Sequence, residues 1–284
     1  MARAPLPGAG KADKAAVVQL AEGAMIRGAG KSMVAAGIGG ILLMPAAALA
    51  QTFDVKQLDV TGGALEAASD NTVHGGIRRR DDNRSAHDLS LDYGVSDAWR
   101  LSGLLKLENP LDQDFRLARS AVENIWVFRP VPKQGGLGLG WFTSVEVATD
   151  PAATNTSQFG PIVALKGDKL AFTANPFLEK TFGRNRIEGI ALNYGWNVKY
   201  PLNDTLAIGV EGFGLIENLG DPGSLAEQQH RLGPALFATI KLGEHLTITP
   251  DVGLFFGLTE ATPSLTLKLN VGVPLVEPSR SADK

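Results

Sequence analysis

LTLKLNVGV, at positions 265–273, places an apolar residue at every second position and a polar residue or glycine between them. The same period of two recurs in LNYGWNVKY at 192–200 and in LTITPDVGLFFGL at 246–258. Because side chains point alternately to the two faces of a strand, each stretch predicts a β-strand with one apolar and one polar face. The pattern therefore indicates a β-sheet protein, either a membrane barrel or a soluble β-sandwich.

Twelve strands are predicted when the same criterion is applied along the chain. They lie at about 57–69, 87–95, 99–108, 115–130, 137–148, 158–166, 170–182, 189–201, 205–216, 231–242, 246–258 and 265–276. Short connections alternate with longer ones, which is typical of outer-membrane barrels and places both ends of the barrel on the short-turn, periplasmic side. We predict an all-β fold, a single antiparallel transmembrane barrel of about twelve strands, with ten or fourteen strands as alternatives.

Three short turns predict the register of their hairpins. Residues that oppose each other across an antiparallel pair share a face, so apolar residues should meet apolar residues. Val95 is expected opposite Trp99, Tyr200 opposite Leu206, and Leu242 opposite Leu246. The turn at Gly167 gives no consistent register.

Composition limits the classes of function. The 284 residues include no cysteine, so neither a disulfide framework nor a cysteine metal site is available. The first fifty residues hold five Lys or Arg and two Asp or Glu, so the remainder carries a net charge near −6, which disfavours nucleic acid as a partner. A mean hydropathy of +0.02 excludes a bundle of membrane helices.

The amino-terminal region predicts export. An apolar stretch from Met33 to Ala50 follows Arg27 and Lys31 and ends in a small-x-small sequence, which predicts cleavage before Gln51. We assign residues 1–50 to a signal peptide with an extended or mis-started amino terminus, 51–276 to an outer-membrane barrel and 277–284 to a carboxy-terminal tail. Met25 is an alternative start. A single membrane anchor is the weaker interpretation, because the run is short and contains proline.

The polar positions of the predicted strands would line the lumen. They carry charges of both signs, which can hold water and bias passage by charge and size, or close the lumen as ion pairs. Glu211 and Arg231 come from neighbouring strands and are candidates for one such pair. The lumen-lining candidates are Asp92, Lys106, Glu108, Asn175, Glu179, Asn193, Lys199, Glu211, Arg231, Lys241, Asp251 and Lys268.

Other chemistry has weak support. Asp81, Asp82, Ser85, His87 and Asp88 bring acids, a hydroxyl and an imidazole together on the first long loop, as a hydrolase requires, but interleaved arginines explain them as a solvated loop. The four histidines lack metal-site spacing, and the glycine pairs lack the context of a phosphate loop. We therefore expect no enzymatic activity, no metal and no cofactor.

Four phrases carry a family resemblance: DYGVSD at 92–97, GVEGFG at 209–214, HRLGPALF at 230–237 and FGLTEATP at 256–263. They resemble the Gram-negative outer-membrane proteins of the phenol-degradation meta-pathway group, often described as transporter-like. The resemblance covers roughly residues 85–276. It implies an outer-membrane barrel that helps aromatic or other small molecules to cross, without catalytic residues.

The resemblance departs from the usual pattern at the end of the chain. Such barrels end on an aromatic residue that the barrel assembly machinery reads, whereas here the last strand runs through 273–276 and continues to Lys284. The expected partners are outer-membrane lipid, lipopolysaccharide, the assembly machinery and an unnamed small solute. We expect a passive channel or transporter-like protein, with a closed structural or sensory barrel and a barrel-embedded hydrolase as alternatives.

Overall fold

A computed structural model describes residues 52–75, 84–109, 114–243 and 246–278. The predicted signal peptide at 1–50 and its cleavage before Gln51 lie outside these residues, as do residues 279–284 of the predicted tail. Within the described ranges, no helix is long and apolar enough to cross a membrane.

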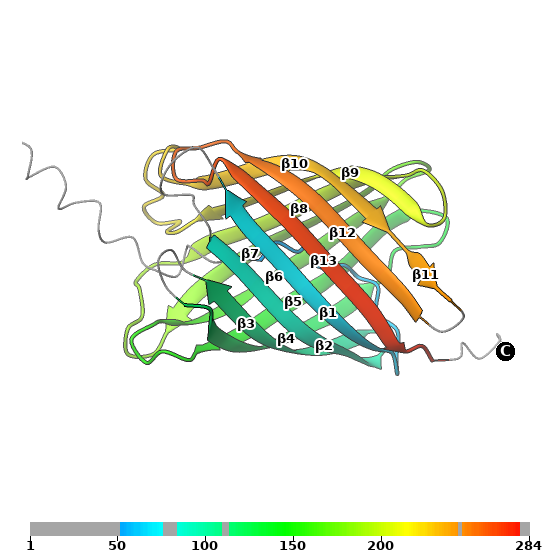
Figure 1. The fold of residues 1–284 in the computed structure, drawn as a ribbon, viewed down its shortest axis with the longest axis horizontal. Coiled ribbons are helices and arrows are strands. Elements are labelled where there is room, and N and C mark those ends of the chain that lie inside the picture. Colours follow the sequence, from blue (N-terminus) through cyan, green and yellow to red (C-terminus); the bar gives the residue numbers. More distant parts are fainter. Residues whose placement is uncertain (1–51, 76–83, 110–113, 244–245, 279–284) are drawn as a thin grey trace, which may run out of the picture. The chain divides into compact units, whose positions relative to one another are not determined.

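The described residues form one curved antiparallel sheet (Figure 1). Its strands are β1 (Leu65–Gly75), β2 (Arg84–Ser96), β3 (Trp99–Asn109), β4 (Arg116–Arg129), β5 (Gly136–Ala148), β6 (Asn155–Lys166), β7 (Ala171–Phe182), β8 (Ala191–Pro201), β9 (Leu206–Ile216), β10 (Gln229–Ala238), β11 (Ile240–Leu242), β12 (Leu246–Gly257) and β13 (Leu265–Val276).

The sheet closes on itself. From β1 to β10 each strand pairs with the next in the chain, and the last strand, β13, pairs with β1 along its length. β10 and β11 are separated only by Thr239, and both pair with β12, so they are two parts of one strand. The protein is therefore a closed twelve-stranded antiparallel barrel, as the sequence predicted.

The two faces of the wall are inverted relative to a soluble protein. On β2, Leu89, Leu91 and Tyr93 point outward and are 47–50% exposed. Their neighbour Asp88 points inward and is buried. Apolar residues on the outside and polar residues inside are typical of a transmembrane barrel, and the soluble sandwich is wrong.

The predicted first strand is wrong. Instead of 57–69, β1 begins at Leu65 and ends at Gly75. Residues 52–64 precede it, and we call them the inner segment. Residues 52–58 lie inside the barrel, whereas Gly63 and Ala64 bond to Gly94 and continue the ladder of β1 with β2. The position of residues 52–58 follows from their contacts, which reach the inward faces of strands all around the wall: Asp88 of β2, Glu123 of β4, Thr173 of β7, Arg231 of β10 and Asn270 of β13.

Apolar packing holds the inner segment in place. Phe53 and Val55 form a buried cluster with Phe213 and Phe255 of the wall. Lower in the segment, Leu58 packs over β5, where a Cβ on Gly140 would lie 2.4 Å from the Leu58 Cδ2 atom. The same Cβ would lie 2.6 Å from the Trp126 carbonyl oxygen of β4, a backbone atom, so glycine is required there.

The register predictions were partly correct. Leu242 does oppose Leu246. A register shift between Gly94 and Ser96 places Ser96, rather than Val95, opposite Trp99. Tyr200 opposes Ile208, two residues beyond Leu206, because Pro201 extends β8 and pairs with Ala207. The shift of two residues keeps the same face inward.

The turn at Gly167 is also resolved by the structure. Lys166 pairs with Ala171, so the loop contains four residues, Gly167–Leu170, and Leu170 lies outside the ladder. The loop is closed by the Gly167 amide, which donates to the Leu170 carbonyl at 2.8 Å.

Candidate solute pathway in the barrel lumen

The inner segment is bound to the wall by polar contacts as well as by packing. The Asn270 side chain donates to the Phe53 carbonyl at 2.9 Å, and the Asn175 side chain donates to the Lys56 carbonyl at 3.1 Å. Both asparagines are buried and come from strands on different sides of the barrel, β13 and β7. These bonds satisfy backbone carbonyls in the part of the segment that precedes its ladder contacts with β2.

A lysine on the inner segment makes the strongest of these contacts. The Lys56 ammonium lies 2.8 Å from the Glu123 carboxylate of β4 and 3.2 Å from Asp54. Burial alone would lower the pKa of Lys56, but the two carboxylates raise it above its usual value. Lys56 is therefore charged at neutral pH and joins the segment to the wall. We call Lys56, Asp54 and Glu123 the anchor network.

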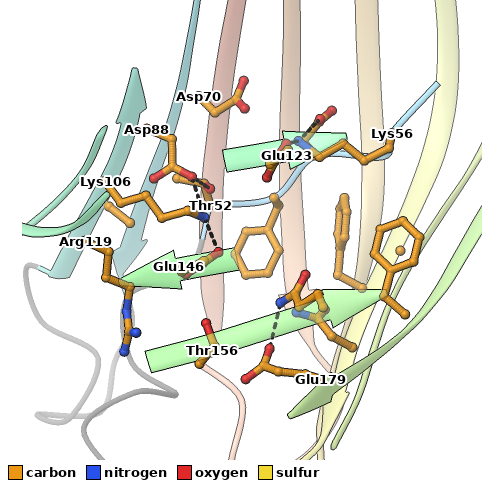
Figure 2. Close-up of a pocket in the computed structure, with 18 of the residues that line it drawn as sticks. Thr52, Lys56, Asp70, Asp88, Lys106, Arg119, Glu123, Glu146, Thr156 and Glu179 are labelled. Atoms are coloured by element: carbon orange, nitrogen blue, oxygen red, sulfur yellow. Dashed lines mark hydrogen bonds and ion pairs between the residues drawn. The ribbon is translucent and has the colours of Figure 1, made fainter. Parts of the chain in front are cut away.

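Beside the inner segment lies a polar cavity of about 140 Å³ (Figure 2). A cavity of about 150 Å³ holds a molecule the size of benzene. The charged residues that line it are seven acids and three bases: Asp54, Asp70, Asp88, Glu108, Glu123, Glu146, Glu179, Lys56, Lys106 and Arg119. The cavity thus has a large formal excess of negative charge.

Only part of this negative charge is paired. Figure 2 shows Lys106 between Asp88 and Glu146, at 3.1 and 3.0 Å. Within the described ranges, neither Asp70 nor Glu179 forms an ion pair. Glu179 instead accepts a hydrogen bond from the Gln158 side chain at 2.7 Å.

An amide oxygen is a further hydrogen-bond acceptor in the cavity wall. The Oδ1 atom of Asn175 is buried at the cavity wall and has no partner among the described residues. The cavity therefore offers more hydrogen-bond acceptors than donors, and it suits water or a cationic solute.

A second charged cluster lies in another part of the lumen wall. The Lys268 ammonium of β13 binds the carboxylates of Glu211 on β9 and Asp251 on β12, the latter at 2.7 Å. The side chains of Lys268 and Glu211 are fully buried. We call these three residues the wall network, because all three belong to barrel strands.

The predicted pair of Glu211 with Arg231 is wrong. In the register, Arg231 opposes Phe213 and Glu211 opposes Gly233, so the two charges are offset along neighbouring strands. Lys268 takes the carboxylate instead. Arg231 lies over the Phe53 ring, 4.3 Å from its centroid, and donates to the Thr266 hydroxyl at 3.2 Å.

Most of the predicted lumen residues do face inward. Besides the residues described above, Lys199 lies over the Phe237 ring at 4.1 Å, and Glu108, which lines the cavity, binds Arg116 at 2.8 Å. Lys241 opposes Thr247, which shares the inward face of β12 with Asp251, so it is also on the lumen side, but it lies beside the turn to β12 and its side chain is exposed. The other inward residues at the predicted positions are Asp92, Lys106, Glu108, Asn175, Glu179, Asn193, Lys199, Glu211, Arg231, Asp251 and Lys268.

The residues considered for hydrolysis lie on both sides of the barrel wall. Asp81 and Asp82 lie outside the described residues. Asp88 points into the lumen, where it lines the cavity. Ser85 and His87 have the same parity in β2 as the exposed Leu89, so they lie on the outer face.

Comparisons with known proteins agree on the fold. The sequence matches no protein-family model and no curated protein. An outer membrane channel from Pseudomonas putida F1 has a similar structure, with a TM-score of 0.54 and 12% identity over 78% of this chain and 100% of that one. At such low identity the likeness shows a shared fold, that of an outer-membrane barrel.

Two more distant solved structures are also barrels. The NanC porin gives a TM-score of 0.48 at 12% identity, covering 75% of this chain and 100% of its own. The outer membrane phospholipase of Salmonella typhi gives 0.38 at 12% identity, covering 76% and 91%. These two likenesses are too weak to support an argument about function.

Proposed function

We propose that the chain is a narrow, passive outer-membrane channel for small molecules. The observation that carries the proposal is the polar cavity of about 140 Å³ inside a closed barrel whose outer face is apolar. Among the described residues, the cavity has one acceptor without a partner, Oδ1 of Asn175, and two acidic side chains without an ion pair, Asp70 and Glu179. Polar groups of this kind hold water and guide solutes.

The inner segment determines the width of the proposed pathway. It crosses the lumen and is attached to the wall by the anchor network and by the cluster of Phe53 and Val55. In this position it leaves room for a solute about the size of benzene. Larger solutes require the segment to move away from the wall.

Charge sets the proposed selectivity. The cavity carries seven acidic and three basic groups, so cations are concentrated in it and anions are excluded. Aromatic rings line the same space, with Phe142 and Phe177 stacked at 4.4 Å between centroids. The resemblance to phenol-pathway proteins supports small aromatic solutes as one class, and membership of that family is part of the proposal.

The proposal includes the route to the membrane. The signal sequence would be removed before Gln51, and the chain would be inserted by the barrel assembly machinery among outer-membrane lipid and lipopolysaccharide. The apolar outer face supports this location.

A closed structural barrel is the second candidate, and the inner segment favours it. If the anchor network never releases, the lumen stays occluded. A disulfide can distinguish the two, because the chain has no native cysteine. The Cγ2 atom of Val55 lies 3.6 Å from the position of a Cβ on Gly195, so Val55→Cys with Gly195→Cys can link the segment to β8.

The test is single-channel conductance of the refolded chain 51–284 in a planar bilayer. For a channel, we expect discrete steps, which oxidation of the double-cysteine variant reduces and reductant restores. The two single-cysteine variants, treated with the same oxidant, are the matched controls. A silent bilayer from a barrel that is shown to be folded by heat-modifiable migration would support the closed structural barrel.

A further inference from the structure

Three polar side chains meet on the outer wall of the barrel: Asn71 of β1, and Ser85 and His87 of β2. Asn71 and His87 oppose each other directly in the register, and Ser85 is two residues from His87, so all three share one face. Leu89 and Val73 have the same parity on these strands and are 48% and 45% exposed. The group therefore lies outside the lumen, separate from the solute pathway.

The hydrogen bonds fix the orientation of the amide. The Asn71 Nδ2 group donates to the Leu269 carbonyl at 2.9 Å and to the Ser69 carbonyl at 3.2 Å. Both acceptors are backbone oxygens, so they can only face the NH₂ end of the side chain. The amide oxygen, Oδ1, is consequently the atom that lies 2.8 Å from Nδ1 of His87.

This orientation in turn fixes the tautomer of the imidazole. Since Oδ1 of Asn71 is an acceptor, Nδ1 of His87 carries the proton, and Nε2 is left with a lone pair. The Ser85 hydroxyl lies 3.0 Å from Nε2 and donates to it. In an activated serine nucleophile, the hydroxyl donates to one imidazole nitrogen, and an oxygen acceptor orients the imidazole through the other nitrogen. Ser85, His87 and Asn71 have this arrangement.

We propose that Ser85, His87 and Asn71 form the catalytic triad of an esterase that acts on acyl esters of membrane lipids. Ser85 is the nucleophile, His87 the general base and acid, and Asn71 a positioning residue. This activity goes beyond the proposed channel and differs from the expectation of no enzymatic activity.

The position of the triad selects a lipid as the substrate. Ser85 and His87 are among the first residues of β2, at the end of the barrel with the longer loops. The outward apolar residues Leu89 and Leu91 follow them along the strand. The Phe115 ring, 53% exposed, lies 5.4 Å from the His87 ring. Acyl chains lying on these apolar residues would place their ester bonds at the border of the apolar surface, beside the triad.

The reaction balances with water as the second substrate. The Ser85 oxygen attacks the ester carbonyl carbon as His87 Nε2 takes the hydroxyl proton. The bond to the leaving alcohol then breaks, and the alcohol oxygen receives that proton, leaving an acyl-serine. Water attacks the acyl carbon and gives a proton to Nε2. The serine–acyl bond breaks, the fatty acid leaves, and Nε2 returns the proton to Ser85.

The register also places an amide near the developing oxyanion. Asn109 of β3 directly opposes Ser85 and shares its face. Residues opposed in this way have Cβ atoms about 5 Å apart, so the Asn109 side chain is within reach of a carbonyl that Ser85 attacks.

The test uses the refolded chain 51–284 in detergent micelles with a fluorescent fluorophosphonate, which forms a covalent bond with activated serines. We expect labelling of Ser85, identified by mass analysis of the labelled peptide, and release of fatty acid from phosphatidylethanolamine micelles. Removal of one triad member lowers turnover by about 10³-fold or more in serine hydrolases. Ser85→Ala and His87→Ala should therefore abolish both signals.

Matched variants separate catalysis from structure. Ser157→Ala removes another serine of the barrel wall, which has no histidine partner among the described residues, and should leave both signals unchanged. Asn71→Leu should remove labelling, whereas Asn71→Asp keeps an oxygen acceptor for Nδ1 and should retain it. A structural role for Asn71 would not produce this difference.

The proposal is overturned if the folded wild-type chain takes up no more probe than Ser85→Ala, or if His87→Ala labels at the wild-type rate. Heat-modifiable migration on a gel establishes folding for each variant. Neither result depends on conductance, so the esterase and the channel can fail independently.

Discussion

Two of the lysine-centred networks in the lumen, the anchor network and the wall network, use the same chemistry for different purposes. In the anchor network, Lys56 joins the inner segment to β4, and its side chain is 15% exposed. In the wall network, Lys268 joins three strands of the barrel and is fully buried with Glu211. One network connects a separate segment to the wall, and the other connects the wall to itself.

The two networks should therefore affect different properties, the stability of the barrel and the passage of solutes. A buried charge that loses its partner cannot reach water unless the barrel unfolds, so the wall network should affect the free energy of unfolding. The anchor network faces the cavity, where water can solvate a released carboxylate. It should therefore affect conductance more than stability.

The largest effect is expected for Lys268→Met. The change leaves Glu211 fully buried without its cation, and loss of one partner of a buried pair costs about 3–5 kcal/mol. The measurement is the free energy of unfolding in urea from phospholipid vesicles. Lys241→Met, at an exposed lysine on β11, is the control and should change little. A loss below about 1 kcal/mol for Lys268→Met would contradict the structural role of the wall network.

The next effect is expected for Lys56→Met. Without the ammonium, the inner segment loses its ion pair with Glu123 at 2.8 Å, and the segment leaves the wall more often. Single-channel conductance should rise several-fold, while the free energy of unfolding falls by less than for Lys268→Met. Unchanged conductance together with a large loss of stability would reverse the assignment of the two networks.

Much of this fold could be predicted from the sequence, because the period of two is a local property. The strand from Leu265 to Val276 was placed correctly, since lipid outside and polar groups inside impose alternation on every residue of a strand. Residues 57–64 of the inner segment are wrongly predicted as part of the first strand. Phe53 and Val55 pack in one cluster with the wall and Leu58 packs in another, so the buried positions 53, 55 and 58 follow no regular period.

The site was harder to predict than the fold. Alternation correctly places Glu211 and Lys268 on the lumen side, but their pairing joins β9 to β13, which are not neighbours. Only the closure of the barrel brings them together. The outer triad is hard to predict for a related reason. Ser85 and His87 are close in the sequence, whereas Asn71 lies on the preceding strand and meets them only through the register.

A smaller effect is expected for the charge of the cavity. The double variant Asp70→Asn with Glu179→Gln removes two carboxylates that form no ion pair among the described residues. The permeability ratio of potassium to chloride should fall, because two acidic groups of the cavity are removed. Reversal potentials in a salt gradient measure it. Asp168→Asn, in an exposed turn, is the control, and an equal change there would place the selectivity outside the cavity.

The smallest effect is expected from pH near neutrality. Burial alone would raise the pKa of Asp54, but the Lys56 ammonium lowers it below its usual value. The contribution of Asp54 to the anchor network is thus complete above the usual aspartate pKa of about 3.9 and is lost as pH falls through its lower folded value. The raised pKa of Lys56 keeps its contribution complete below the usual lysine pKa of about 10.4.

Conductance should consequently stay constant between about pH 5 and 9 and rise only below about pH 4. Single-channel recording across this range is the measurement, and Asp54→Asn, which cannot titrate, should show a smaller rise at acid pH. An increase centred near pH 6 would assign the release of the inner segment to a group outside the anchor network, because neither Asp54 nor Lys56 changes its charge there.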